Sequence, residues 1–256
     1  TKPLAVVLDK SFLRGSSADI IDKLCTHHNV LIIDDLMYEL LDNPQDREQC
    51  FAKLPTGGNA LIFLKGIGPL IRYENTHGRP ASPLSEHRIP GILSINRRFR
   101  ERCFNFSIYD AKAEEWKETV AKDVGELIDL STTINRLWPN IEGNPSYRTG
   151  LLDEVSNNRE IIQSFYGKIA DQCSSPKYKI DENWVSFRWL QAKVMYCIQL
   201  FSTHKGQICT ARPTDVEHDL HDLRYLVYAS LSGSIATKDE KLKRNFFRLR
   251  PDGVVL

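Results

Sequence analysis

The sequence lacks any apolar run near the roughly 20 residues that a membrane-spanning helix needs. The runs at residues 4–8 and 30–33 have the length of β-strands instead. The N-terminal stretch also lacks a long hydrophobic core followed by a small-residue cleavage site, which argues against a secretory signal peptide. These absences predict a cytoplasmic protein with no membrane partner.

Paired cysteines and an excess of charge of one sign are lacking as well. The cysteines are widely spaced, with no C-x-x-C pair, at Cys25, Cys50, Cys103, Cys173, Cys197 and Cys209. This spacing argues against a zinc site or a disulfide framework and predicts buried, reduced thiols. The 34 basic residues nearly cancel the 33 acidic residues, so any affinity for nucleic acid must come from local patches.

Two phosphate-binding motifs are absent, because neither G-x-x-x-x-G-K nor G-x-G-x-x-G occurs. Glycine and proline, at 14 and 12 residues, are present at ordinary globular levels, which excludes collagen-like and low-complexity chains. The length of 256 residues predicts one large domain, or one domain with a substantial insertion.

The two ends of the chain show the pattern of an α/β fold. Apolar runs at residues 4–8 and 30–33 alternate with helical stretches at residues 18–25 and 34–41. Because these runs are apolar throughout, we expect strands of a parallel sheet that are buried on both faces, the first of them central.

The C-terminal segment continues this pattern. Thr214 and Glu217 form a capping-box pattern, which predicts a helix from there to about Ser232, ended by Gly233. Residues 234–237 and 253–256 are predicted strands. We therefore expect residues 1–44 and 212–256 to form one discontinuous core: a parallel sheet flanked by helices.

The residues between these ends are predicted to be mostly helical. Residues 45–211 are expected to form a helical insertion or lobe, some of whose helices complete the core. Apolar residues recur there at helical spacing from Trp116 onward, and the part before residue 90 is rich in glycine and proline. Within that part, residues 61–70 resemble the glycine hairpin of helix-hairpin-helix DNA binders, or else a Gly-Pro turn between two helices.

Acidic residues follow the predicted strands at one edge of the sheet. Asp9 ends the first strand, where ligands bind in open parallel sheets, although Asp also caps helices well. Asp239 follows the strand at residues 234–237 and is expected at the same edge. Glu39 shares one helix face with Asp35 and Asp42, a pattern that also suits solvated surface.

A second acidic group begins the helix that starts near residue 214. Residues 215–223 carry four acids and two histidines but no lysine or arginine. The helix dipole explains Asp215 and Glu217 without any function, but it explains Asp222 less well. His218 and His221 make a transition-metal site an alternative, although no H-E-x-x-H motif is present.

The order of these segments resembles the PIN-domain nuclease family. The matching segments are Val7-Leu8-Asp9-Lys10-Ser11, Leu36-Met37-Tyr38-Glu39-Leu40, Asp222-Leu223-Arg224-Tyr225-Leu226-Val227-Tyr228-Ala229 and Ile235-Ala236-Thr237-Lys238-Asp239. The family has a first Asp ending strand one, a Glu on a following helix, an Asp opening a helix, and a Thr-x-Asp after the next strand. A compact member has a much shorter middle, so the resemblance covers only the two ends.

The resemblance implies a PIN-like core with four catalytic, metal-binding acids, namely Asp9, Glu39, Asp222 and Asp239. It also implies supporting hydroxyls on Ser11 and Thr237, and Asp219 is the alternative to Asp222. Clustered carboxylates repel one another unless a cation lies among them, and hard oxygen ligands favour Mg²⁺ or Mn²⁺. Such an ion can activate water to hydrolyse a phosphodiester bond.

The expected function is thus a metal-dependent endonuclease. RNA is the expected substrate, although some relatives cut DNA, and the family allows a regulatory or antitoxin-like protein partner. One alternative is an inactive PIN-like scaffold that binds RNA or protein. A less favoured one is a haloacid-dehalogenase-like phosphatase with Asp9 as nucleophile, because Ser11 occupies the place of that family's second Asp.

Two basic clusters are candidates for binding the phosphate backbone. The first comprises Arg97, Arg98, Arg100 and Arg102, and the second comprises Lys238, Lys241, Lys243, Arg244, Arg248 and Arg250. Phe99, Phe246 and Phe247 are candidates to stack on unpaired bases. The alternative is that the rings belong to the core and the charges to a solvated rim.

Overall fold

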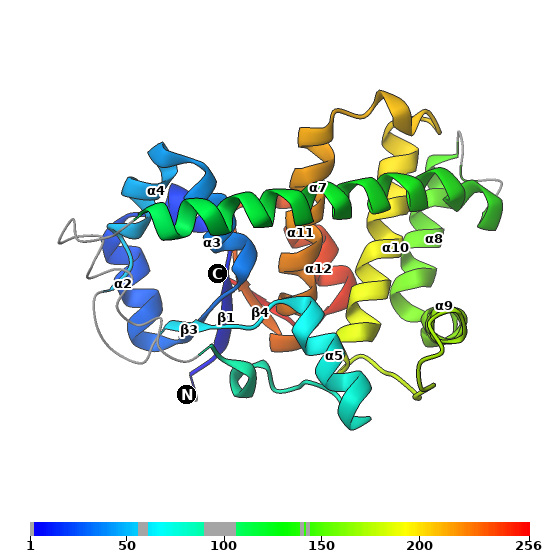
Figure 1. The fold of residues 1–256 in the computed structure, drawn as a ribbon, viewed down its shortest axis with the longest axis horizontal. Coiled ribbons are helices and arrows are strands. Elements are labelled where there is room, and N and C mark those ends of the chain that lie inside the picture. Colours follow the sequence, from blue (N-terminus) through cyan, green and yellow to red (C-terminus); the bar gives the residue numbers. More distant parts are fainter. Residues whose placement is uncertain (1–2, 56–60, 90–105, 139–140, 142–143) are drawn as a thin grey trace.

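The computed structural model describes residues 3–55, 61–89, 106–138, 141 and 144–256. The described residues form an α/β fold around one parallel sheet (Figure 1). Its strands are β1 (Ala5–Leu8), β2 (Asn29–Ile32), β3 (Leu61–Phe63), β4 (Ser234–Ala236) and β5 (Val254–Val255), in the order β3-β2-β1-β4-β5. Every pairing between neighbours is parallel, and β1 is the central strand, as predicted.

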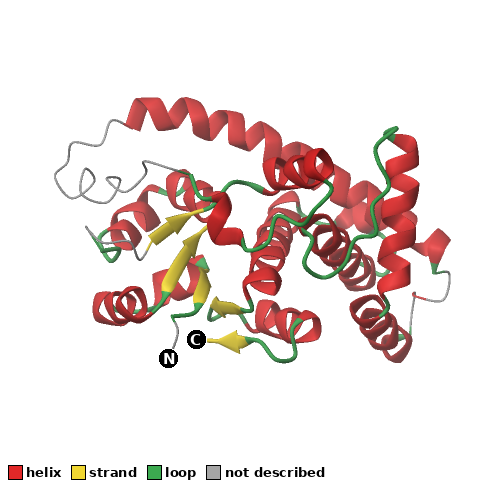
Figure 2. Cartoon of the chain, turned by 90° about the horizontal axis from the view of Figure 1, so that it is seen from below, coloured by secondary structure: helices red, strands yellow, loops and turns green. Residues whose placement is uncertain are grey.

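Helices flank this sheet (Figure 2). They are α1 (Lys10–Gly15), α2 (Ala18–His27), α3 (Asp34–Asp42), α4 (Pro44–Phe51), α11 (Pro213–Ser232) and α12 (Glu240–Leu249). Val6, Val7 and Leu8 of β1 have no exposed surface. Their complete burial explains why this strand is apolar throughout, since helices cover both faces of the sheet.

The middle of the chain is largely helical, as predicted. It contains α5 (Ile67–His77), α7 (Phe106–Leu137), α8 (Pro145–Asn157), α9 (Arg159–Gln172) and α10 (Val185–Thr203), with short 3-10 turns at Leu84–His87 and Ile208–Thr210. Helix α7 contacts α3 and α11 as well as α10, so it joins the sheet region to the helical region (Figure 1). Within the described residues, no helix combines the length and hydrophobicity needed to cross a membrane.

The segment at residues 61–70 differs from both predictions made for it. Leu61–Phe63 is strand β3, which pairs with β2, and α5 begins at Ile67. The segment is therefore a strand followed by a helix, and neither a helix-hairpin-helix nor a turn between two helices. The middle of the chain supplies a strand to the sheet as well as helices.

Two further local predictions need correction. Helix α11 exists and ends at Gly233, whose φ of 80° suits glycine, but it begins at Pro213 and no side chain caps it. The Thr214–Glu217 capping box does not form, because Arg212 rather than Thr214 is the N-cap residue, and Glu217 accepts a hydrogen bond from Tyr38 instead. Of the described cysteines, all of which are free, Cys173 and Cys209 are exposed rather than buried.

The carboxylate of Glu74 connects α5 to the start of α10. Glu74 of α5 is fully buried and accepts hydrogen bonds from the N–H groups of Val185 and Ser186 at 2.7 and 2.9 Å. It also accepts from the Ser186 hydroxyl at 2.5 Å and from the Ala81 N–H at 3.1 Å. Glu74 therefore caps α10, whose own N-cap residue, Trp184, makes no side-chain cap. Burial raises the pKa of Glu74, and these hydrogen bonds oppose that rise.

We expect Glu74→Ala to reduce the free energy of unfolding by about 3 kcal/mol, because the substitution leaves several buried donors without an acceptor. Urea denaturation followed by circular dichroism measures this loss. Glu154→Ala, at an exposed position of α8, is the control and should change stability by no more than about 0.5 kcal/mol. Equal effects of the two substitutions would show that the buried cap is unimportant.

Candidate functional site

Asp9 lies at the carboxyl end of β1, beside the end of β4. Its Oδ2 atom accepts hydrogen bonds from the hydroxyls of Ser11 and Thr237, the latter at 2.6 Å. Asp9 occupies the N-cap position of α1, yet its side chain makes no capping hydrogen bond. Its carboxylate is held by the two hydroxyls that the resemblance named as supporting groups.

Asp239 and Thr237 lie next to this carboxylate in the loop after β4. The Asp239 Oδ1 atom accepts from the Leu242 N–H at 2.7 Å and so caps α12. The Thr237 hydroxyl contacts Asp9 and also accepts from the Asp239 N–H at 3.0 Å. Thr237 therefore ties the two predicted acids together, and Asp239 has a structural role in addition to any chemical one.

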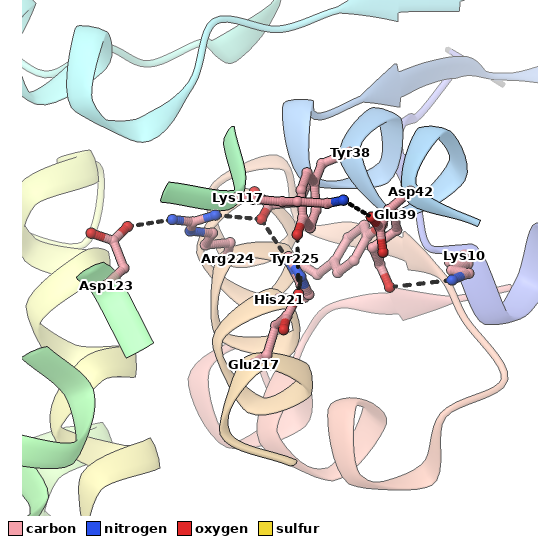
Figure 3. A network of polar contacts seen from close by, with 11 residues as sticks. Lys10, Tyr38, Glu39, Asp42, Lys117, Asp123, Glu217, His221, Arg224 and Tyr225 are labelled. Atoms are coloured by element: carbon pink, nitrogen blue, oxygen red, sulfur yellow. Dashed lines mark hydrogen bonds and ion pairs between the residues drawn. The ribbon is translucent and has the colours of Figure 1, made fainter. Parts of the chain in front are cut away.

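Glu39 comes from α3 and points toward α11 (Figure 3). Its Oε2 atom accepts a hydrogen bond of 2.9 Å from the Tyr225 hydroxyl, and the Lys10 Nζ atom lies 3.9 Å from Oε1. The Glu39 side chain is only 13% exposed. Both contacts hold the Glu39 carboxylate near the end of β1, because Lys10 is the residue that follows Asp9.

Asp222 differs from the other three acids. Within the described part of the chain, no group donates a hydrogen bond to its carboxylate or forms an ion pair with it. Its rival Asp219, three residues earlier on α11, is paired with the Lys241 ammonium. Asp222 therefore keeps its oxygens available for a ligand, whereas Asp219 is already neutralised.

The four predicted acids interact electrostatically. Burial is the main reason why the pKa values of Asp9, Glu39 and Asp222 are raised. The charge of Asp239 adds to this rise at Asp9 and Asp222, and the charge of Asp9 adds to it at Glu39 and Asp222. Asp9, Glu39 and Asp222, from three segments of the chain, thus each lie close enough to another of the four acids for its charge to raise their pKa.

The oxygen donors suit Mg²⁺ or Mn²⁺, but their arrangement is not that of a ready coordination sphere. Among the residues that the structure describes, no three His, Cys, Asp or Glu side chains are grouped so that they could hold a metal ion. One carboxylate oxygen of Asp9 and one of Asp239 already accept hydrogen bonds from groups of the protein. Only Asp222 among the four has both oxygens uncommitted in the described residues.

A buried network beside this site was not predicted from the sequence (Figure 3). Asp35, whose side chain is 2% exposed, accepts from Arg224 Nη1 at 2.6 Å and contacts His221 Nδ1 at 2.8 Å. Arg224 also pairs with Asp123 of α7, and His221 Nε2 lies 3.7 Å from Glu217 Oε1. This network joins α3, α7 and α11.

Charge pairing sets the protonation of the network. Burial acts to raise the pKa of Asp35, but the nearby Arg224 charge and the His221 hydrogen bond outweigh it and lower the pKa. Burial opposes the protonation of His221, yet its contacts with Asp35 and Glu217 raise its pKa to about 9. Both ring nitrogens of His221 face carboxylates, Asp35 at 2.8 Å and Glu217 at 3.7 Å, so the structure gives the transition-metal alternative no support at this histidine.

The second basic cluster is largely engaged within the protein. Lys238 contacts the Gly15 carbonyl, Lys241 pairs with Asp219, and Lys243 pairs with Glu240 at 2.7 Å. Arg244 is exposed on the same helix, α12.

The aromatic candidates divide in the same way. Phe246 is fully buried, so its proposed stacking on bases is wrong, whereas Phe247 is 44% exposed. The first basic cluster, at residues 97–102, and Phe99 lie outside the described residues.

Comparisons with family models, curated proteins and solved structures give no match to this chain. The chain is an α/β protein with a parallel five-stranded sheet, and Asp9 and the Thr237–Asp239 segment lie where β1 and β4 end.

We expect His221 to make stability depend on pH in a defined window. The folded protein holds the His221 proton up to about pH 9, compared with the ordinary pKa of 6.5. The stabilisation is therefore complete below about pH 6.5 and is lost as the pH rises through about 9, a loss on the order of 3 kcal/mol. Urea denaturation at several pH values measures it.

His221→Gln should flatten this decline, because glutamine does not titrate. His218→Gln is the matched control, since His218 is exposed on the same helix, and it should keep the wild-type slope. A wild-type slope in His221→Gln would show that the buried imidazole is not protonated.

Proposed function

We propose that the chain is a metal-dependent, PIN-like endonuclease that hydrolyses phosphodiester bonds in RNA. Asp9, Glu39, Asp222 and Asp239 are its metal-binding acids in this proposal. The observation that carries it is the link at the ends of β1 and β4: the Thr237 hydroxyl donates to Asp9 at 2.6 Å and accepts from the Asp239 N–H at 3.0 Å, and the charges of both acids act on Asp222.

The positions of these residues support the family assignment. Asp9 ends the first strand, Glu39 lies on a following helix, and the Thr237-Lys238-Asp239 segment follows β4. Asp222 lies inside α11, two turns after its start, rather than opening the helix as in the family pattern. Its uncommitted carboxylate nevertheless makes it a better ligand than Asp219, which is paired with Lys241.

The raised pKa values of Asp9, Glu39 and Asp222 favour the binding of a cation at this site. Carboxylates that repel one another are costly to ionise together, and a divalent ion removes that cost. When bound, such an ion supplies a water of lowered pKa for in-line attack on phosphorus. The hydrogen bonds from Ser11 and Thr237 lower the pKa of Asp9 and keep its carboxylate oriented for binding.

Neighbouring side chains support a single-stranded RNA substrate. The exposed Arg244 and Phe247 lie on α12, the helix that Asp239 caps. Arginine attracts the phosphate backbone, and an exposed ring can stack on an unpaired base, which a duplex does not offer.

A non-catalytic scaffold is the second candidate function. The capping role of Asp239 and the absence, among described residues, of a group arranged to hold a metal favour it. The phosphatase alternative has less support, because the Ser11 hydroxyl donates to Asp9 and stands where a second acid is needed.

We expect Mn²⁺ to stabilise the wild-type protein by about 2 to 3 kcal/mol at a hundredfold excess over its dissociation constant, a gain of several degrees in Tm. Asp222→Asn should raise Tm without metal, because it removes a repelling charge, and should lose most of the Mn²⁺ effect. Asp129→Asn, at an exposed site on α7, is the control and should behave as wild type. Thermal unfolding with and without Mn²⁺ measures both effects, and a scaffold would show none.

We expect Asp9→Asn and Asp239→Asn to cut Mn²⁺-dependent cleavage of a labelled single-stranded RNA at least about a hundredfold, the equivalent of roughly 3 kcal/mol of lost transition-state stabilisation. Asn caps helices about as well as Asp, so Asp239→Asn should leave α12 folded. Gel assays of RNA and of DNA of the same sequence measure rate and polymer preference. Full activity of either variant, purified free of host nucleases, would exclude the assignment.

A further inference from the structure

A cavity of about 420 Å³ lies beside the first turn of α3, and none of the four predicted metal-binding acids lines it. It is lined by residues from α3, α5, α7, α10 and α11. Its size is within the range of small-molecule sites, which hold ligands among apolar walls with a few convergent polar groups. Nothing in the proposed nuclease chemistry uses this cavity.

The polar groups of the cavity are predominantly acidic. Asp34, Asp35, Glu115 and Asp123 line it, and Arg224 is the one cationic residue in its described lining. Both terminal nitrogens of Arg224 are engaged, one with Asp35 and the other with Asp123. The guanidinium is therefore already neutralised and offers little to an anionic ligand.

Asp34 is the acid that remains without a counter-charge of its own. Within the described chain, no side chain donates a hydrogen bond to its carboxylate or pairs with it. The turn before α5 packs closely on this carboxylate, since a Cβ added to Gly66 would lie 2.4 Å from Asp34 Oδ2. Glycine at position 66 thus makes room for an acid at the cavity wall.

Aromatic side chains form much of the remaining wall. Trp116, Trp189 and Tyr38 line the cavity together with Ile67 and Pro69. The Trp189 ring already attracts one cation, because the Lys193 Nζ atom lies 5.5 Å from its centroid. Aromatic rings are the surroundings in which proteins often bind organic cations.

We propose that this cavity binds a small organic cation, an ammonium or guanidinium group carried on an apolar or aromatic body. The Asp34 carboxylate is its counter-ion, and Trp116 and Trp189 flank the body. The proposal is independent of the nuclease proposal, since it uses none of the four metal-binding acids.

The protonation state of Asp34 should make the affinity for a cation depend on pH. Burial, and then the charge of Asp35, raise the pKa of Asp34 to about 7, although Arg224 opposes the rise. The other charged groups around the cavity are Glu115 and Asp123 on α7, with His221 behind Asp35 on α11. Because the neutral acid cannot pair with a cation, affinity should fall as the pH drops below about 7.

The test uses three probes of similar shape: 2-phenylethylammonium, 2-phenylethanol and phenylacetate. Binding is followed by tryptophan fluorescence and by calorimetry. We expect the ammonium compound to bind at pH 8 and to bind at least about tenfold more weakly at pH 5.5. Preference for phenylacetate, equal binding of the neutral alcohol, or no binding of any probe would overturn the proposal.

Variants identify the residues responsible. Asp34→Asn should weaken binding of the ammonium probe about tenfold or more and remove its pH dependence, while Trp189→Leu should weaken it about threefold or more. Gly66→Ala should also weaken it, because the added methyl displaces the carboxylate without changing its charge.

Asp129→Asn should bind as wild type and serves as the matched charge control. Unchanged affinity in Asp34→Asn would contradict the proposal. If that variant does not fold, the probe preferences and pH dependence of the wild-type protein decide the question.

Discussion

The parallel pairing of β1 with β4 is the constraint on which the rest of the structure depends. It aligns Val7 with Ile235 and Leu8 with Ala236, and the Asp9 N–H extends the pairing by donating to the Ala236 carbonyl at 3.1 Å. Strands separated by more than 220 residues thereby end together. A slip of one residue would turn every side chain of the shifted strand to the other face of the sheet. The hydrogen bonds from Ser234 Oγ to the Ala5 carbonyl at 2.7 Å and from Thr237 to Asp9 at 2.6 Å form only in the observed register. The same register places Thr237 against Asp9.

Burying Asp9, Glu39 and Asp222 near one another disfavours their ionised forms, and hydrogen bonds from the protein compensate only in part. Asp9 receives two hydroxyl donors and Glu39 receives the Tyr225 hydroxyl, yet burial still keeps the pKa values of both acids raised. Asp222 receives no such donor in the described chain, and burial raises its pKa well above the ordinary value. Buried acids left partly unsatisfied are typical of binding and catalytic sites, because a ligand rather than the protein supplies the missing charge.

The sequence allowed most of the sheet to be predicted, because its long strands are apolar throughout and end at acids. It did not reveal β3, which is only three residues long and precedes a Gly-Ile-Gly-Pro segment that suggested a turn. The position of Asp9 follows from the end of its strand. The network of Asp35, His221 and Arg224 could not be predicted, because its partners are 186 and 189 residues apart and only tertiary packing pairs them. For the same reason the sequence predicts a capping role for Glu217, whereas in the structure Glu217 accepts a hydrogen bond from Tyr38, 179 residues away.

Helix α11 connects the acidic cluster to the buried network through its spacing. Asp222 and Tyr225 are three residues apart: Tyr225 donates to Glu39, and Asp222 interacts electrostatically with Asp9 and Asp239. His221 and Arg224 are also three residues apart, and both contact Asp35. Residues at that spacing share a helix face, so α11 carries two adjacent polar faces, and His221 from one and Tyr225 from the other reach α3. The positive charge of His221 also acts on Glu39 and lowers its pKa against the effect of burial. The buried network therefore helps to keep Glu39 ionised, which is the state in which a carboxylate binds a cation.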